Sequence, residues 1–133
     1  MPKSTAQAAA IPWRDGRICM VTSRSGRRWV VPKGRIEKDH TPQEAAAAEA
    51  WEEAGLRGRF GAGALGTYRY EKFGAEFEVV VFLMHVDHVA VDWPEVEVRE
   101  REWVGLEEAL SRIEEADLRR LLRSAAAALA MGV

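Results

Sequence analysis

The sequence predicts an α+β fold, in which a β-sheet sandwich surrounds one central helix and further helices close the molecule near the C-terminus. Short runs rich in β-branched and aromatic residues, separated by glycine-containing turns, are typical of strands and recur along the chain. A helix with strong start and stop signals interrupts them at 42–54, and two helical stretches follow at 106–115 and 117–131. Strands and helices in this order pack as layers, so we expect helices on the outside of a sheet.

The first two strands are expected at 6–13 and 18–23, because Asp15-Gly16 between them is a favoured two-residue hairpin turn. The second strand contains Cys19, flanked by apolar residues. We interpret it as a small buried hydrophobic residue and not as a catalytic thiol. It is the only cysteine in the sequence, so the chain has no internal disulfide.

A short apolar run, Trp-Val-Val-Pro at 29–32, predicts a further strand, followed by a glycine turn and a charged loop at 35–40. The central helix then begins at Pro42. Thr41 is a typical N-cap, and Glu44 lies three residues after it to complete a capping box. Gly55 is the expected stop, since glycine adopts the left-handed conformation found just beyond helix ends.

Two longer strands are expected at 65–73 and 77–86 around Gly74, and a last one at Trp103-Val104. The helical stretch 117–131 is amphipathic. Four aromatic residues are candidates to stack on an adenine, although aromatic residues on strands are more often core or cross-strand partners, and we favour that alternative. They are Tyr68, Tyr70, Phe73 and Trp93.

The central helix carries three carboxylates, Glu49, Glu52 and Glu53, on one face. Like charges three and four residues apart disfavour a helix by about 0.2–0.5 kcal/mol per pair, which suggests that a divalent cation compensates them. The alternative is a solvated face, with Glu53 paired to Arg57 four residues on. An adjoining flank of alanines is small enough to press against the sheet: Ala46, Ala47, Ala50 and Ala54.

Basic residues cluster just before this helix and form a candidate phosphate-binding surface, with a solvated turn as the alternative. They are Arg24, Arg27, Arg28, Lys33, Arg35 and Lys38. The formal net charge of the whole sequence is −2, so the chain has no global attraction for a nucleic acid polymer or an anionic membrane. We expect a phosphorylated small molecule as the partner.

The spacing around the acidic residues resembles the box of the Nudix pyrophosphohydrolase family, G-x5-E-x7-R-E-U-x-E-E-x-G-U, where U is aliphatic. The matching positions are Gly34, Glu49, Glu52, Glu53, Gly55 and Leu56. Two positions differ, because His40 replaces the first glutamate and Ala48 replaces the arginine. We interpret the two differences as a linked loss of a carboxylate and a guanidinium. His40 is also a candidate ligand, although a solvated histidine is the simpler alternative.

The resemblance implies the Nudix fold, a mixed sheet with helices outside, and water attack on the phosphorus of a pyrophosphate with Mg²⁺ or Mn²⁺ as cofactor. Glu49 and Glu53 would hold the cation with a backbone carbonyl near Gly34, and Glu52 would accept the proton of the attacking water. The base differs between family members, so Glu49 remains the alternative. The phosphate-binding candidates are Lys33, Arg35, Arg24 and Arg28. A later acid often completes the metal shell in the family, and Glu97 or Glu100 is the candidate unless 94–100 is an alternating strand.

Within the family, the run from Trp29 to Gly34 and the segments Asp92-Trp93 and 101–109 resemble diadenosine polyphosphate and diphosphoinositol polyphosphate hydrolases. Substrates of either type are therefore expected. A Nudix-fold module that binds a phosphorylated ligand without hydrolysing it is the alternative, motivated by His40 and Ala48. We further expect one domain over residues 1–133, a cytoplasmic location because no run approaches the ~20 apolar residues of a membrane span, and a possible homodimer through the C-terminal helix.

Overall fold

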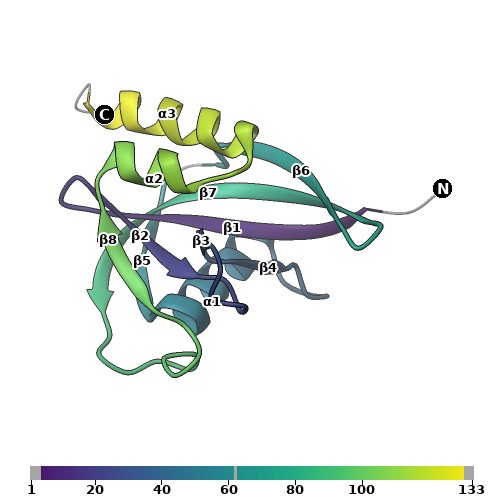
Figure 1. Cartoon of the computed structure of the whole chain (residues 1–133), viewed down its shortest axis with the longest axis horizontal. Helices are drawn as coiled ribbons and strands as arrows, with labels where there is room; N and C mark the ends of the chain where they lie inside the picture. Colours follow the sequence, from purple (N-terminus) through teal and green to yellow (C-terminus); the bar gives the residue numbers. More distant parts are fainter. Residues whose placement is uncertain (1–3, 62, 131–133) are drawn as a thin grey trace.

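A computed structural model of the chain describes residues 4–61 and 63–130 (Figure 1). Within these residues, eight strands form one sheet and three helices pack on its faces. The strands are β1 (Thr5–Arg14), β2 (Arg17–Thr22), β3 (Trp29–Val30), β4 (Lys33–Arg35), β5 (Leu56–Phe60), β6 (Gly66–Lys72), β7 (Ala75–Val89) and β8 (Arg101–Val104). The helices are α1 (Pro42–Ala54), α2 (Leu106–Arg112) and α3 (Ala116–Ala130).

The sheet is mixed, as the resemblance implied. β1 and β7 are its long central strands and pair in parallel, from Thr5 opposite Phe77 to Trp13 opposite His85. The other pairings are antiparallel: β2 and β4 pair with β1, β5 and β6 with β7, and β3 and β8 with β2. β4 places its three residues on β1 directly before the loop that leads into α1. This topology brings the glycine turn and the acidic helix together.

Two cores lie on opposite faces of the sheet, because side chains alternate along β1. Ala9 and Ile11 face one core, which α2 and α3 cover, whereas Ala8 and Ala10 face the other, which α1 covers. Figure 1 shows the same arrangement, with α2 and α3 above the sheet and α1 below it. The small residues on the α1 side allow this helix to lie close to the strands. The alanines of α1 that are fully buried or nearly so are Ala45, Ala46, Ala50 and Ala54.

The helix signals in the sequence are confirmed. The Thr41 hydroxyl accepts a hydrogen bond from the Glu44 backbone N–H at 3.1 Å, and the Thr41 N–H donates to the Glu44 carboxylate at 2.8 Å. Gly55 has a φ of 68°, in the left-handed region, and ends α1. The hairpin turn is also confirmed, since Asp15 and Gly16 both have positive φ.

Several expected elements have different limits. The helix expected at 106–115 ends at Arg112, and residues 113–115 form a link to α3; Met131, expected at the end of α3, lies outside the described residues. The alternating-strand reading of 94–100 is wrong, since residues 94–98 form turns. β5 was not predicted because Gly58 interrupts it. That glycine lies so close to the backbone of His85 that a Cβ would be 2.0 Å from its carbonyl oxygen, and the pairing with β7 is irregular there.

Candidate functional site

Helix α1 turns Glu53 into the protein. Glu53 is 5% exposed, its Oε1 accepts a hydrogen bond from the Lys33 backbone N–H at 3.4 Å, and its Oε2 lies 3.6 Å from the Arg99 guanidinium. The alternative of a solvated face with a Glu53–Arg57 ion pair is wrong. The Arg57 guanidinium instead lies 4.0 Å from the ring centre of Trp51. A carboxylate buried against a backbone N–H and a guanidinium is not part of a solvated helix face.

Gly34 of β4 lies directly against Glu49. A Cβ built on Gly34 would lie 2.4 Å from the Glu49 carboxyl carbon, closer than any real contact, so only glycine leaves the carboxylate in this position. Glu49 is half-buried and one turn before Glu53, whereas Glu52 is exposed. The three acids therefore differ in environment, with two facing β4 and one accessible to water.

The two inward carboxyls perturb one another. Burial raises the pKa of Glu53 to about 8, and hydrogen bonding to the Glu49 carboxyl raises it as well, whereas the Arg99 guanidinium lowers it. Burial also raises the pKa of Glu49, against the lowering effect of its hydrogen bond with Glu53, while the negative charges of Glu52 and Glu95 raise it further. Two neighbouring carboxylates that are partly shielded from solvent tend to bind a proton or a cation. Their oxygen donors match the ligand preference of Mg²⁺.

Among residues 4–61 and 63–130, no three His, Cys, Asp or Glu side chains lie close enough together to enclose a metal ion. This is compatible with magnesium, which is commonly held by one or two carboxylates together with the phosphates of a substrate. Glu49 and Glu53 with the adjacent Gly34 backbone are thus a fitting donor set for such an ion.

Sequence reasoning missed Arg99 and Glu95. The Arg99 side chain is 8% exposed and is held by the Glu95 carboxylate at 2.7 Å and by the Thr22 carbonyl at 2.8 Å, besides its approach to Glu53. The later acid close to the inward pair is Glu95, whose negative charge raises the pKa of both Glu49 and Glu53, whereas Glu97 and Glu100 are exposed. The signal was present as a Glu-x-x-x-Arg spacing within a turn, which a strand interpretation of 94–100 concealed.

The C-terminal end of α1 is fixed by two further side chains. The Trp93 indole N–H donates to the Glu53 carbonyl at 3.0 Å, and Arg101 donates to the Ala54 carbonyl at 2.7 Å while its guanidinium lies 4.1 Å from the Trp93 ring centre. A cation at this end of a helix also complements the helix dipole. Trp93 therefore has a structural task, which agrees with the alternative favoured over adenine stacking.

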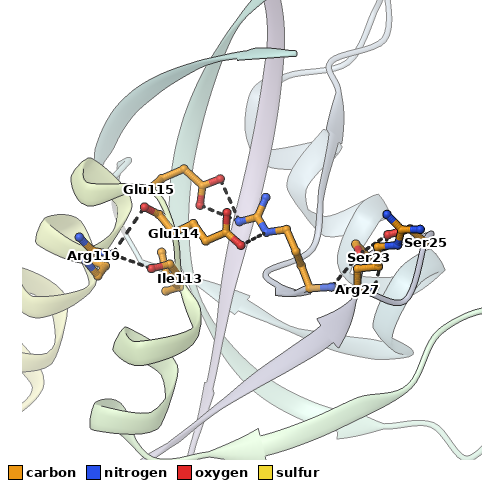
Figure 2. A network of polar contacts seen from close by, with 8 residues as sticks. Ser23, Ser25, Arg27, Ile113, Glu114, Glu115 and Arg119 are labelled. Atoms are coloured by element: carbon orange, nitrogen blue, oxygen red, sulfur yellow. Dashed lines mark hydrogen bonds and ion pairs between the residues drawn. The ribbon is translucent and has the colours of Figure 1, made fainter. Parts of the chain in front are cut away.

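A cleft of about 260 Å³ opens over this arrangement. It has one acidic wall residue, Glu53, and a basic lining, and we call it the inner cleft. Its charged lining residues are Arg24, Arg28, Lys33, Glu53, Lys72 and Arg99. Burial lowers the pKa of Lys33, and the Glu53 charge opposes this effect. Three of the six basic candidates, Arg27, Arg35 and Lys38, are exposed and do not line the cleft. A fourth, Arg28, lines it but forms ion pairs with Glu114 and Glu115. Figure 2 shows the side chains of these two acids turned toward one guanidinium.

Comparison with known proteins decides the family. The model of the NUDIX domain matches residues 3–125, nearly the whole chain. The chain belongs to the NUDIX domain family. Nudix hydrolase 16, mitochondrial, of Arabidopsis thaliana is 37% identical in an alignment over 102 residues that covers 71% of this chain and 56% of that protein. Diphosphoinositol polyphosphate phosphohydrolase 3-alpha of Mus musculus is 34% identical over 100 residues, 73% of this chain and 60% of that protein.

This Nudix chain spans about half the length of the curated relatives that it matches. Among solved structures, the crystal structure of C. elegans Ap4A hydrolase superposes with a TM-score of 0.80 at 22% identity, covering 96% of this chain and 99% of that one. The α+β Nudix fold expected from the sequence is thereby confirmed. No helix in the described parts of the chain is both long and apolar enough to span a bilayer.

The two departures from the Nudix box lie at the surface, since His40 and Ala48 are both exposed. A carboxylate and a guanidinium missing together from exposed positions leave no buried charge without a partner. The structure provides a buried guanidinium beside Glu53 from elsewhere, namely Arg99. The hypothesis that the two departures compensate one another stays a prediction.

The remaining aromatic candidates are mostly structural. Tyr68 is buried in the core, and Tyr70 stacks on Phe77 at 4.9 Å and donates a hydrogen bond to Gln7 at 2.7 Å. Phe73, by contrast, is 97% exposed in the β6–β7 turn. Cys19 is fully buried, and burial raises its pKa to about 12, which confirms its interpretation as a hydrophobic residue without thiol chemistry.

Proposed function

We propose that this chain is a metal-dependent pyrophosphohydrolase that cleaves a phosphoanhydride bond in a phosphorylated small molecule by water attack on phosphorus. The observation that supports it best is the inward carboxyl pair Glu49 and Glu53, of which Glu53 lines a basic cleft and Glu49 lies beside it against Gly34. Carboxylates facing a polyanion would weaken its binding unless a cation lies between them. A module that only binds its ligand would gain nothing from this arrangement.

Each residue of the site has a proposed task. Glu49 and Glu53, with the Gly34 backbone, hold Mg²⁺ or Mn²⁺. When bound, such an ion neutralises phosphate charge and lowers the pKa of a water molecule. Glu52 is the proposed general base, since it is exposed to water on the same helical turn as the two ligands. Glu49 remains the alternative base.

The basic residues orient the phosphate chain. Lys33 and Arg24 line the inner cleft and are the proposed main phosphate ligands, and Arg28 and Arg35 are the further candidates. Fixed positive charges of this kind stabilise the negative charge that spreads over the equatorial oxygens during phosphoryl transfer. The substrate is proposed to be a dinucleoside polyphosphate or a diphosphoinositol polyphosphate, the two types suggested by the names of its relatives.

The test is a substrate panel with Mg²⁺: diadenosine tetraphosphate, a nucleoside diphosphate sugar and a diphosphoinositol polyphosphate. Wild-type protein and Glu53→Gln are compared, with Glu97→Gln as the matched control, since Glu97 is exposed and outside the cleft. We expect Mg²⁺-dependent turnover of at least one compound, unchanged in the control and reduced at least a hundredfold in Glu53→Gln. Measurable binding without turnover of any member would instead favour the non-catalytic module.

A further inference from the structure

Arg28 forms part of the wall between two cavities. Besides the inner cleft, it lines a second cavity of about 400 Å³, here called the outer cleft. Arg28, Lys33 and Lys72 line both. A substrate that extends from the inner cleft into the outer one would contact these shared residues, so the partners of Arg28 affect which substrate fits.

Arg28 is held by two carboxylates. Its Nη2 donates to both oxygens of Glu115 at 3.3 and 3.1 Å, and its Nε lies 2.9 Å from Glu114 Oε2. Figure 2 shows the side chains of Glu114 and Glu115 turned toward the same guanidinium. Nη2 is thus shared between the two oxygens of Glu115. Hydrogen bonds between two charged groups are among the stronger polar interactions, so a phosphate must compete with Glu115 for this arginine.

The two carboxylates are supplied by the short link between α2 and α3, and that link is fixed. The Arg119 guanidinium donates to the Ile113 carbonyl at 2.8 Å, as Figure 2 also shows. Ile113 is itself buried in the core, at 3% exposure. The acidic pair thus projects from a segment whose backbone is anchored, and both residues line the outer cleft.

The charges of the two clefts differ accordingly. The inner cleft has five basic side chains and one acid, Glu53. In the outer cleft, three acids offset the three shared basic residues, so that the formal charges cancel; the acids are Glu71, Glu114 and Glu115. A chain of phosphates is therefore favoured in the inner cleft and is not favoured in the outer one.

We infer that Glu114 and Glu115 determine specificity by occupying Arg28, so that the outer cleft accepts an uncharged, hydrogen-bonding group such as a nucleoside and rejects a densely phosphorylated ring. This inference rests on the proposed function and selects between its two substrate types: dinucleoside polyphosphates are preferred over diphosphoinositol polyphosphates. The carboxylates offer acceptors to amino and hydroxyl groups, and Tyr70 contributes an aromatic wall to the same cavity.

The decisive experiment compares kcat/KM for diadenosine tetraphosphate and for a diphosphoinositol polyphosphate in wild-type protein and in the double variant Glu114→Gln/Glu115→Gln. Wild type should prefer the dinucleotide. The double variant frees Arg28 and removes two negative charges, so the preference should fall at least tenfold, and by less at high salt, where charges are screened. The matched control is Glu97→Gln/Glu107→Gln, which removes the same charge from exposed positions outside both clefts.

Arg28→Met provides the opposite change, because it leaves the two acids without their cation. In this variant, kcat/KM for the diphosphoinositol compound should fall below the wild-type value, and kcat/KM for the dinucleotide should fall less. Calorimetric binding of inositol hexakisphosphate separates this inference from the proposed function, since it requires no hydrolysis: the Glu114→Gln/Glu115→Gln protein should bind it at least tenfold more tightly than wild type. Equal binding, or a wild-type preference for the diphosphoinositol substrate, would overturn the inference. Loss of turnover alone would concern only the proposed hydrolysis.

Discussion

Replacing Glu53 by glutamine separates the effect of the buried carboxyl on stability from its effect on cation binding. Burial raises the pKa of Glu53 from its ordinary value of 4.5 to about 8. Between these values the folded protein retains a proton that the unfolded chain has lost. The free energy of unfolding of the metal-free protein therefore falls as the pH rises through this window, by at most about 1.4 kcal/mol per pH unit from this group.

Glutamine resembles the neutral acid in shape and cannot lose the proton. From about pH 5.5 to about pH 7.5, wild-type protein should therefore lose about 2.7 kcal/mol relative to Glu53→Gln, or roughly 10 °C in Tm for a domain of this size. Arg99 keeps its contacts to Glu95 and Thr22 in the variant, so the guanidinium is not left alone. The variant should be the more stable protein near neutral pH and the less active one.

Urea unfolding across this pH range, first with a chelator and then with Mg²⁺, measures both parts of the prediction. At a hundred times its dissociation constant, the ion should stabilise wild-type protein by about 2.7 kcal/mol and the variant by much less. The gain should grow with pH, since a cation and a proton compete for the same carboxyl. Parallel pH profiles of wild type and Glu53→Gln in the chelator would refute the reasoning, because they would show that Glu53 titrates normally.

Substitutions at four further positions test other parts of the site. Arg99→Met should cost about 3 kcal/mol in urea unfolding, because it leaves the Glu95 carboxylate and the Thr22 carbonyl without their cationic partner, whereas Arg99→Lys should cost less; equal losses would contradict a charge role. Gly34→Ala should leave Tm nearly unchanged but weaken Mn²⁺ binding at least tenfold, since the new Cβ displaces the flexible end of Glu49; unchanged Mn²⁺ binding would argue against this site. Lys33→Ala should raise KM more for long phosphate chains than for short ones, and a uniform rise would exclude a role in reading chain length. Ala48→Arg should not increase kcat/KM, and a large gain would disprove compensation for the altered box.

Much of the fold followed from local signals. The capping box at Thr41, the stop at Gly55 and the hairpin at Asp15 depend on neighbouring residues only, and the structure confirms them. β4 and β5 were not predicted, since one has three residues and the other contains Gly58, so neither has a detectable periodicity. Such strands form because a long neighbour offers hydrogen-bonding partners, and the sequence of the short strand does not show this.

The site likewise combines features that local spacing indicated with long-range contacts that the sequence did not show. The Gly34–Glu49 and Glu53 arrangement was indicated by spacing along one helix and one turn. Arg99 was not, because its approach to Glu53 joins segments 46 residues apart in number, and its own turn resembled a strand. Arg28 appeared to be a free phosphate ligand in the sequence, whereas the structure pairs it with the link after α2. Long-range contacts of this kind assign charged residues to partners that composition cannot identify.

The central claim is that Glu49 and Glu53 bind a divalent cation beside a basic cleft, which Glu53 lines. Titration of Mn²⁺ followed by electron paramagnetic resonance, with and without a non-hydrolysable dinucleoside polyphosphate analogue, tests it most directly. The account predicts bound Mn²⁺ in wild type, tighter with the analogue, and at least tenfold weaker binding in both Glu49→Gln and Glu53→Gln but not in Glu97→Gln. Equal Mn²⁺ binding by all four proteins would contradict it.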